Sequence, residues 1–365
     1  MDLSAPHRVP LTWLMAHGSE AIQLRTAREL APEGREDLPA LELALVESKA
    51  IQALTRKQKD NGVWGGNLLG VNKSAKDGIK DVGTIQQYRR LIQLGYPSTG
   101  RPFKLADRLL WRYLSRDDDP ALLFEYRKTV KAAPAANEWV RNHLREAATC
   151  ALAEAGHDDD PRIRGAAHRI ATSVSQFLRS PLAEKPFSRS GKALILNPAA
   201  HPPSWYSISM VASTPNLRRE RAGFSGRLAN YLLQPASRRT YVIPVGRKKI
   251  KPIHVVLGDP MEADARGNVR DLPLALQFIE VLCHLGVVGE STSAVHVLER
   301  LYRSCDDQGV WRPKRVPAVS KLPNPVTYHS FPLQTSATTG EGRFADVTFR
   351  LARIAKLMDR PIEYT

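Results

Sequence analysis

The chain has 365 residues, of which 42% are hydrophobic and 25% charged, and this composition is typical of a globular protein with a substantial core. No stretch approaches the roughly 20 apolar residues of a membrane span, and the first residues lack a basic region followed by an apolar run, so we expect neither a membrane span nor a signal peptide. The three cysteines are too few and too scattered for a disulfide framework, which favours a cytoplasmic location.

Apolar residues recur at helical spacing along most of the chain, after a start that has no clear period. Residues 1–36 are mixed and contain prolines, so they predict an irregular N-terminal extension ahead of a single domain over residues 37–365. Helices are predicted over residues 38–57, 81–94, 104–115, 137–155, 161–178, 224–233, 272–285, 292–304 and 344–358. Almost no segment predicts a strand, and the expected fold is therefore all-α.

A short phrase occurs twice, near the two ends of the chain. Residues 58–64 read Gln-Lys-Asp-Asn-Gly-Val-Trp, and residues 305–311 read Cys-Asp-Asp-Gln-Gly-Val-Trp. Glycine allows a sharp exit from a helix, tryptophan is a large apolar plug, and a glutamine amide can bond to free backbone groups of a neighbour. We therefore expect Trp64 and Trp311 to be buried where adjacent structural repeats meet. The two glycines are 247 residues apart, which gives about 49 residues per unit for five units.

A helix, then Gln-x-x-x-Gly-x-Trp, then a loop and a second helix resembles the repeat of the terpenoid cyclase and protein prenyltransferase superfamily. The helix that opens at Asp159-Asp160-Pro161-Arg162 is also similar to the start of such repeats. The resemblance implies a closed α/α toroid of about five to six helix pairs around a central funnel. The second phrase departs from the pattern, because Cys305 stands where glutamine is expected.

The catalytic motifs that the resemblance implies are incomplete in this chain. The acidic runs 117–119 and 158–160 lack the Asp-x-Asp-Asp pattern of cyclases and precede proline, so we expect them to cap helices. Tyr328-His329 resembles the zinc-binding histidine segment of protein prenyltransferases, but the Asp-x-Cys partner is missing. Cys283-His284 is similar to the zinc pair of lanthipeptide cyclases, but no second cysteine lies at the right distance. We therefore expect no metal and no cofactor.

In such a toroid the inner helices begin around one mouth of the funnel, where a ligand could bind. Helix capping and aromatic packing are the alternative explanation for each residue at these starts. The candidates are Asp81, Glu138, Trp139, Trp205, Tyr206, Asp271, Tyr328 and His329.

The net charge of +16 is the strongest indication of function. A cluster between Gly246 and Pro252, with two arginines before it, predicts an exposed basic loop: Arg238, Arg239, Arg247, Lys248, Lys249 and Lys251. Such a loop suits a polyanion, and we expect nucleic acid as the partner. Two alternatives stay open: a divergent enzyme that acts on an isoprenoid or another hydrophobic diphosphate in the funnel, and a protein-interaction scaffold.

Overall fold

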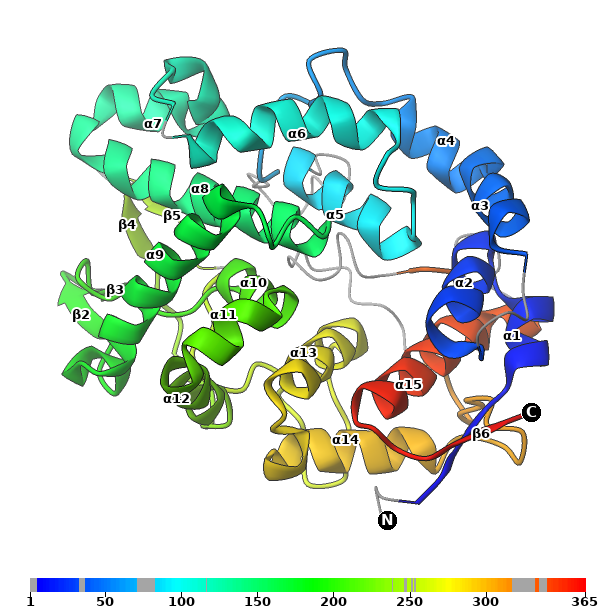
Figure 1. Ribbon diagram of the computed structural model, residues 1–365. Coiled ribbons are helices and arrows are strands. Elements are labelled where there is room, and N and C mark those ends of the chain that lie inside the picture. The colour runs from blue at the N-terminus through cyan, green and yellow to red at the C-terminus, as the bar shows by residue number, and fades with distance from the viewer. Residues whose placement is uncertain are drawn as a thin grey trace.

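The computed structural model describes residues 5–32, 37–70, 83–115, 117–237, 239–245, 248–250, 252, 254–316, 332–334 and 340–365 (Figure 1). The protein is mainly helical, with a few short strands in two-stranded pairs. Within the described ranges, no helix is both long enough and apolar enough to cross a membrane.

The helices are α1 Leu11–His17, α2 Glu20–Arg25, α3 Leu38–Glu47, α4 Lys49–Thr55, α5 Thr84–Leu94, α6 Arg101–Leu114, α7 Arg127–Ala132, α8 Asn137–Glu154, α9 Pro161–Leu178, α10 Trp205–Ser213, α11 Pro215–Glu220, α12 Ala222–Leu232, α13 Leu272–Leu285, α14 Thr292–Tyr302 and α15 Ala345–Leu357. A π-helical turn, Thr26–Leu30, continues α2. The strands are β1 His7–Val9, β2 Phe187–Ser190, β3 Ala193–Leu196, β4 Ile243–Val245, β5 Lys248–Ile250 and β6 Ile362–Tyr364.

Six helices surround the middle of the molecule. Helices α2, α5, α8, α10, α13 and α15 contact one another in that order, and α15 also contacts α2 (Figure 1). Helices α6, α9 and α12 pack outside them, α6 against α5 and α8, α9 against α8 and α10, and α12 against α13. The inner position explains why α10 is buried on all sides: its residues from Trp205 to Ala212, two serines included, are all buried.

The prediction of an irregular N-terminal extension was wrong for residues 5–32. These residues form β1, α1 and α2, and Leu14, Ile22 and Leu24 are fully buried in the core. Strand β1 pairs in parallel with β6, so the two ends of the chain lie side by side. Helices of six and seven residues are too short to show a helical period in the sequence.

The two copies of the repeated phrase have the same local geometry. In the first, Lys59 N–H donates to the Val63 carbonyl at 2.9 Å; in the second, Asp306 N–H donates to the Val310 carbonyl at 2.9 Å. The glycines of the two turns have φ of +85° and +90°, which favours glycine over any other residue. The chain therefore makes the same helix exit at two places far apart in the sequence.

Each phrase also contacts another segment of the chain. Trp64 and Trp311 are both only 2% exposed, which confirms their predicted burial. The backbone N–H of Trp64 donates to Thr84 Oγ1 at 3.1 Å, and that of Trp311 donates to Thr348 Oγ1 at 3.0 Å. Gln58 Nε2 donates to the carbonyl of Pro102 at 2.8 Å, so this glutamine connects the first phrase to the start of α6.

The acidic runs before proline cap helices, as expected. The side chain of Asp119 accepts the Ala121 N–H at 2.8 Å, and the side chain of Asp160 accepts the Arg162 N–H at 2.8 Å at the start of α9. Asp117 forms an ion pair with Arg112. Each of these carboxylates has a local partner.

Candidate functional site

Positive charge is concentrated in one segment of the chain. Residues 179–251, a fifth of the sequence, contain 14 Lys and Arg residues and two acidic residues, and so account for +12 of the net +16. This segment includes the hairpins β2–β3 and β4–β5, which lie beside α9 at one edge of the molecule (Figure 1). Backbone bonds join the hairpins, because Leu196 N–H donates to the Val242 carbonyl at 2.9 Å. We call the described residues of the two joined hairpins and their flanks, 185–196, 239–245 and 248–250, the basic layer.

The basic layer carries cations that are free to meet a ligand. Five of them are exposed, and none forms an ion pair with another described residue: Lys185, Arg189, Lys192, Arg239 and Lys249. The expected exposure of Arg239 and Lys249 is therefore confirmed. Arg238, Arg247 and Lys251 lie outside the described residues, and the side chain of Lys248 is likewise not described.

Other arginines of the same segment have structural partners. Arg218 donates to the carbonyls of Val211 and Ala212 at the end of α10. Arg221 donates to the carbonyl of His168 at 3.0 Å. Arg218 thus satisfies carbonyls that the end of α10 leaves open, whereas Arg221 bonds a carbonyl in the middle of α9. They are therefore not part of the free charge.

A cleft of about 640 Å³ lies between the basic layer and helices α8 and α9. Its walls combine aromatic, apolar and ionisable side chains, among them Glu138, Trp139, Asn142, His143 and Glu146 of α8, Arg169, Ile170 and Val174 of α9, Leu196, Ile243 and Ile250 of the basic layer, and His254. Strand pairing places Ile243 opposite Ile250, so one face of the β4–β5 hairpin turns its apolar residues to the cleft. We call this cavity the aromatic cleft.

A row of rings runs from the rim of the aromatic cleft into the core. The Trp139 and His143 rings are stacked, with centroids 5.2 Å apart and planes 24° apart. His143 lies 5.3 Å from His254, and His254 stacks on Tyr206 at 4.9 Å. Trp139 is half-buried, whereas Tyr206 is fully buried and accepts a hydrogen bond from Gln86 Nε2 at 3.2 Å. The row thus begins at a half-buried ring in the cleft wall and continues through stacked rings to a fully buried one.

Both histidines of this row are neutral near pH 7. Burial lowers the pKa of His143 to about 4. Burial, with smaller contributions from His143 and Arg89, lowers the pKa of His254 well below its usual value. Neither ring nitrogen of His254 has a hydrogen-bond partner among the described residues, although the side chain is only 7% exposed. A neutral imidazole has one donor and one acceptor, and both are open here.

The carboxylate of Glu146 lies deeper in the aromatic cleft and has a local partner. Its Oε1 accepts the Ser204 hydroxyl at 2.7 Å, and Ser204 in turn caps the start of α10. Burial raises the pKa of Glu146. This residue therefore anchors the first turn of α10 beside the ring row.

The structure brings together part of the predicted funnel mouth. Glu138 and Trp139 line the aromatic cleft, and Tyr206 contacts His143 and His254 in its wall. Trp205 does not reach the cleft lining and packs in the core against Phe278, with ring centroids 6.2 Å apart.

The remaining predicted residues lie elsewhere. Asp271 caps α13 by accepting the Leu274 N–H at 3.1 Å. Helix capping was the alternative to a role in ligand binding for this residue. Asp81, Tyr328 and His329 fall outside the described residues.

Most residues of the cleft were not predicted from the sequence, among them His143, Glu146, Arg169 and His254. His143 and Glu146 follow Trp139 at spacings of four and seven on one helix, and this shared helix face is a signal that could have found them. His254 comes from the loop after β5, and no local pattern marks it.

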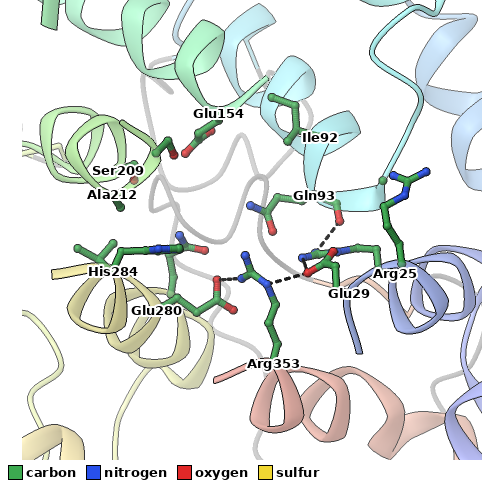
Figure 2. A pocket seen from close by; sticks show the side chains of 15 residues that line it. Arg25, Glu29, Ile92, Gln93, Glu154, Ser209, Ala212, Glu280, His284 and Arg353 are labelled. Carbon is green, nitrogen blue, oxygen red and sulfur yellow. Dashed lines mark hydrogen bonds and ion pairs between the residues drawn. The ribbon is translucent and has the colours of Figure 1, made fainter. Parts of the chain in front are cut away.

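A second cavity, of about 250 Å³, lies where α2, α5, α8, α10 and α13 end (Figure 2). Arg353 Nε lies 2.8 Å from Glu29 Oε2, and Arg353 also pairs with Glu280. Burial alone would raise the pKa of Glu29, but Arg25 and Arg353 lower it to about 2. Arginines suit this place because helix C-termini carry partial negative charge.

The charges at this central cavity are matched to one another. In Figure 2, Arg353 reaches from α15 towards both Glu29 and Glu280, and Arg25 lies on the other side of Glu29. Farther along the wall, Glu154 forms a bidentate pair with buried Arg89, with both N–O distances 2.6 Å. We therefore interpret the central cavity as a compensated ion network that holds the inner helices in place.

Within the described ranges, no group of three or more His, Cys, Asp and Glu side chains is arranged to bind a metal ion. Burial raises the pKa of Cys283 to about 12, so its thiol stays protonated, as suits a core cysteine.

Comparison with known proteins gives no relative: the chain matches no protein-family model, no curated protein and no solved structure. A function must therefore be inferred from the chain's own residues. The resemblance of the repeated phrase to the cyclase and prenyltransferase superfamily stays a prediction.

Proposed function

We propose that this protein binds nucleic acid through the basic layer. The observation that carries the proposal is the set of five exposed cations without ion-pair partners among the described residues, in a segment that holds +12 of the net charge. Lys and Arg side chains that neutralise phosphates release counterions, and this release drives non-specific binding. A surface of this kind contacts the backbone of the polymer and does not read its sequence.

The spread of the charges favours a polymer over a small diphosphate. A diphosphate needs cations that converge on one point, whereas Lys185, Arg189, Lys192, Arg239 and Lys249 are distributed over two hairpins and their flanks. In the lining of the aromatic cleft, Arg145 is already bound to the Tyr113 carbonyl at 3.0 Å, so Arg169 is the one arginine of the described lining that is open to a phosphate. The enzyme alternative therefore has weaker support.

The distribution of apolar residues favours nucleic acid over an anionic membrane surface. Peripheral membrane proteins combine cations with exposed large apolar residues that enter the lipid interface. The large hydrophobic residues that are exposed in the described part of the chain are Leu43, Val316 and Tyr364, and none lies in the basic layer.

We infer further that the helices form a closed α/α toroid, with α2, α5, α8, α10, α13 and α15 as the inner helices. Their cyclic contacts and the two identical helix exits support this arrangement. A solved structure in which α15 and α2 do not touch would contradict it.

The test is fluorescence anisotropy with labelled single-stranded and duplex oligonucleotides from about 50 to about 300 mM salt. The test variant replaces four cations of the basic layer by alanine: Arg189, Lys192, Arg239 and Lys249. The control variant removes the same charge from exposed lysines outside the layer: Lys49, Lys57, Lys59 and Lys104.

We expect the parent's affinity to fall by orders of magnitude across this salt range. The test variant should bind more weakly to all sequences alike, and its salt slope should flatten by about 0.7–0.9 for each phosphate that the variant no longer neutralises. The proposal fails if the parent does not bind at the lowest salt, or if the control variant loses as much affinity as the test variant.

A further inference from the structure

We propose that the aromatic cleft takes up a single nucleobase while the phosphate backbone lies on the basic layer. This inference rests on the proposed function and deepens it. It adds a site that binds a base to a surface that otherwise contacts only phosphates. The combination that points to it is found in one cavity: a half-buried tryptophan, a buried imidazole without hydrogen-bond partners among the described residues, and an arginine without an ion pair among them.

The first element is a stacking surface. Trp139 is half-buried in the wall of the cleft, and its ring is nearly parallel to that of His143, with planes 24° apart. Unpaired bases bind proteins chiefly by stacking on such rings, and every base has a flat face that suits them. A base placed along this row would extend a stack that the protein has already begun.

The second element is the open hydrogen-bonding capacity of His254. Its Nδ1 and Nε2 have no partner among the described residues, and the side chain is 7% exposed. Buried polar atoms are nearly always hydrogen-bonded, so two such atoms on one ring call for a ligand that supplies both a donor and an acceptor. The edge of a nucleobase supplies both, whereas an isoprenoid chain supplies neither.

The third element is the size and charge of the cleft. Its volume of about 640 Å³ exceeds what a base alone needs and leaves room for the attached sugar. Ile170, Ile243 and Ile250 give it apolar patches on its walls. Arg169 lines the same cavity, is exposed, and has no ion pair with a described residue, so it can hold the phosphate.

The acidic residues of the cleft are compatible with this ligand. Glu146 is already bonded to Ser204. Glu138 is exposed, and its carboxylate can accept a hydrogen bond from an exocyclic amino group.

The experiment compares two single strands of equal length at one salt concentration: one with bases and one fully abasic. Five proteins are measured: the parent, Trp139→Ala, Trp139→Phe, His254→Phe and the control Trp111→Ala. Trp111 is another half-buried tryptophan, and it lies in α6, outside the cleft lining. His254→Phe keeps the flat ring and removes both nitrogens, and a thermal melt checks that each variant is folded.

We expect the parent to prefer the base-bearing strand by about 5- to 150-fold, the effect of stacking one base. Trp139→Ala should bring this ratio close to one without changing the affinity for the abasic strand, and His254→Phe should lower it less. Trp111→Ala should behave as the parent. Trp139→Phe should restore much of the preference, because it restores a ring.

The outcomes separate this inference from the proposed function. If the parent binds both strands equally, or if Trp139→Ala and His254→Phe keep the full preference, the base site is refuted while backbone binding stands. If the parent binds neither strand at low salt, the proposed function fails as well.

A further arm distinguishes a base in a strand from a free nucleotide. Saturation-transfer NMR compares a nucleoside monophosphate with ribose phosphate, which lacks a base. If the cleft takes a free nucleotide, the base protons of the monophosphate should give signals with the parent and none with Trp139→Ala, and ribose phosphate should give no signal. Such signals without any preference between the two strands would assign the site to free nucleotides and overturn its role in strand binding.

Discussion

The repeated phrase offers a matched pair of tryptophans, and replacing each by phenylalanine tests how the phrase holds the fold. Trp64 and Trp311 are equally buried, each ends the same kind of turn, and each donates its backbone N–H to a threonine hydroxyl. They differ in one respect. Trp64 Nε1 donates to the Leu54 carbonyl at 2.8 Å, whereas Trp311 Nε1 has no partner among the described residues.

The expected difference follows from this contrast. Both substitutions remove the same atoms from similar sites, so the cavity costs nearly cancel. Trp64→Phe also loses a hydrogen bond that contributes about 1 kcal/mol, whereas Trp311→Phe removes a buried N–H whose unsatisfied state costs about 1–3 kcal/mol. Trp64→Phe should therefore lower the free energy of unfolding by about 2–4 kcal/mol more than Trp311→Phe does.

Urea denaturation followed by circular dichroism measures both variants against the parent, and equal m-values make the midpoints comparable. Trp64→Ala and Trp311→Ala serve as the reference, each with an expected cost of about 3–5 kcal/mol. Equal costs for the two phenylalanine variants, or a larger cost for Trp311→Phe, would show that the indole N–H groups do not distinguish the two copies.

Three further predictions concern the turns, the buried ion pair and the pH dependence. Gly309→Ala should destabilise the protein clearly more than Gly156→Ala in the same urea assay, because both have positive φ but only the Cβ at 309 would lie 2.2 Å from a backbone oxygen. Arg89→Met should cost about 3–5 kcal/mol by leaving Glu154 charged and unpaired, and adding Glu154→Leu should recover much of that stability. Burial lowers the folded-state pKa of His7 to about 4, below its unfolded value, so the unfolded chain takes up the proton first and stability falls as the pH drops from 6.5 towards 4. This histidine alone should cost about 2 kcal/mol by pH 5, and His7→Phe should flatten the decline in melting temperature between pH 7 and pH 5.

The parts of the fold that were predicted are those with strong local signals. The Gly-Val-Trp turns have a glycine at positive φ and a tryptophan large enough to fill a junction, and both features are visible in seven residues. The caps at Asp119 and Asp160 could be predicted for the same reason, since each carboxylate serves a backbone N–H two residues away.

The parts that were missed depend on contacts between distant segments. Helices α1 and α2 are buried because the ends of the chain meet, and β1 exists only through its pairing with β6. A helix of six residues has little stability of its own, so its sequence shows no strong period. His254 likewise belongs to the site only because its ring contacts side chains of α8 and α10, which lie about 50 to 110 residues earlier in the chain.

Only part of the basic layer could be predicted from the sequence, because its cations come from two separate segments of the chain. The run near residue 247 stands out in the sequence, whereas Lys185, Arg189 and Lys192 are scattered and belong to another loop. Helix α9 contacts both α10 and α12, so the loop that leads into α10 and the loop that follows α12 emerge on one side. The bond from Leu196 to Val242 then fastens them into one surface beside the aromatic cleft. The helices thus fix where the two loops meet, and the loops carry the charge, which is the usual division between scaffold and binding surface.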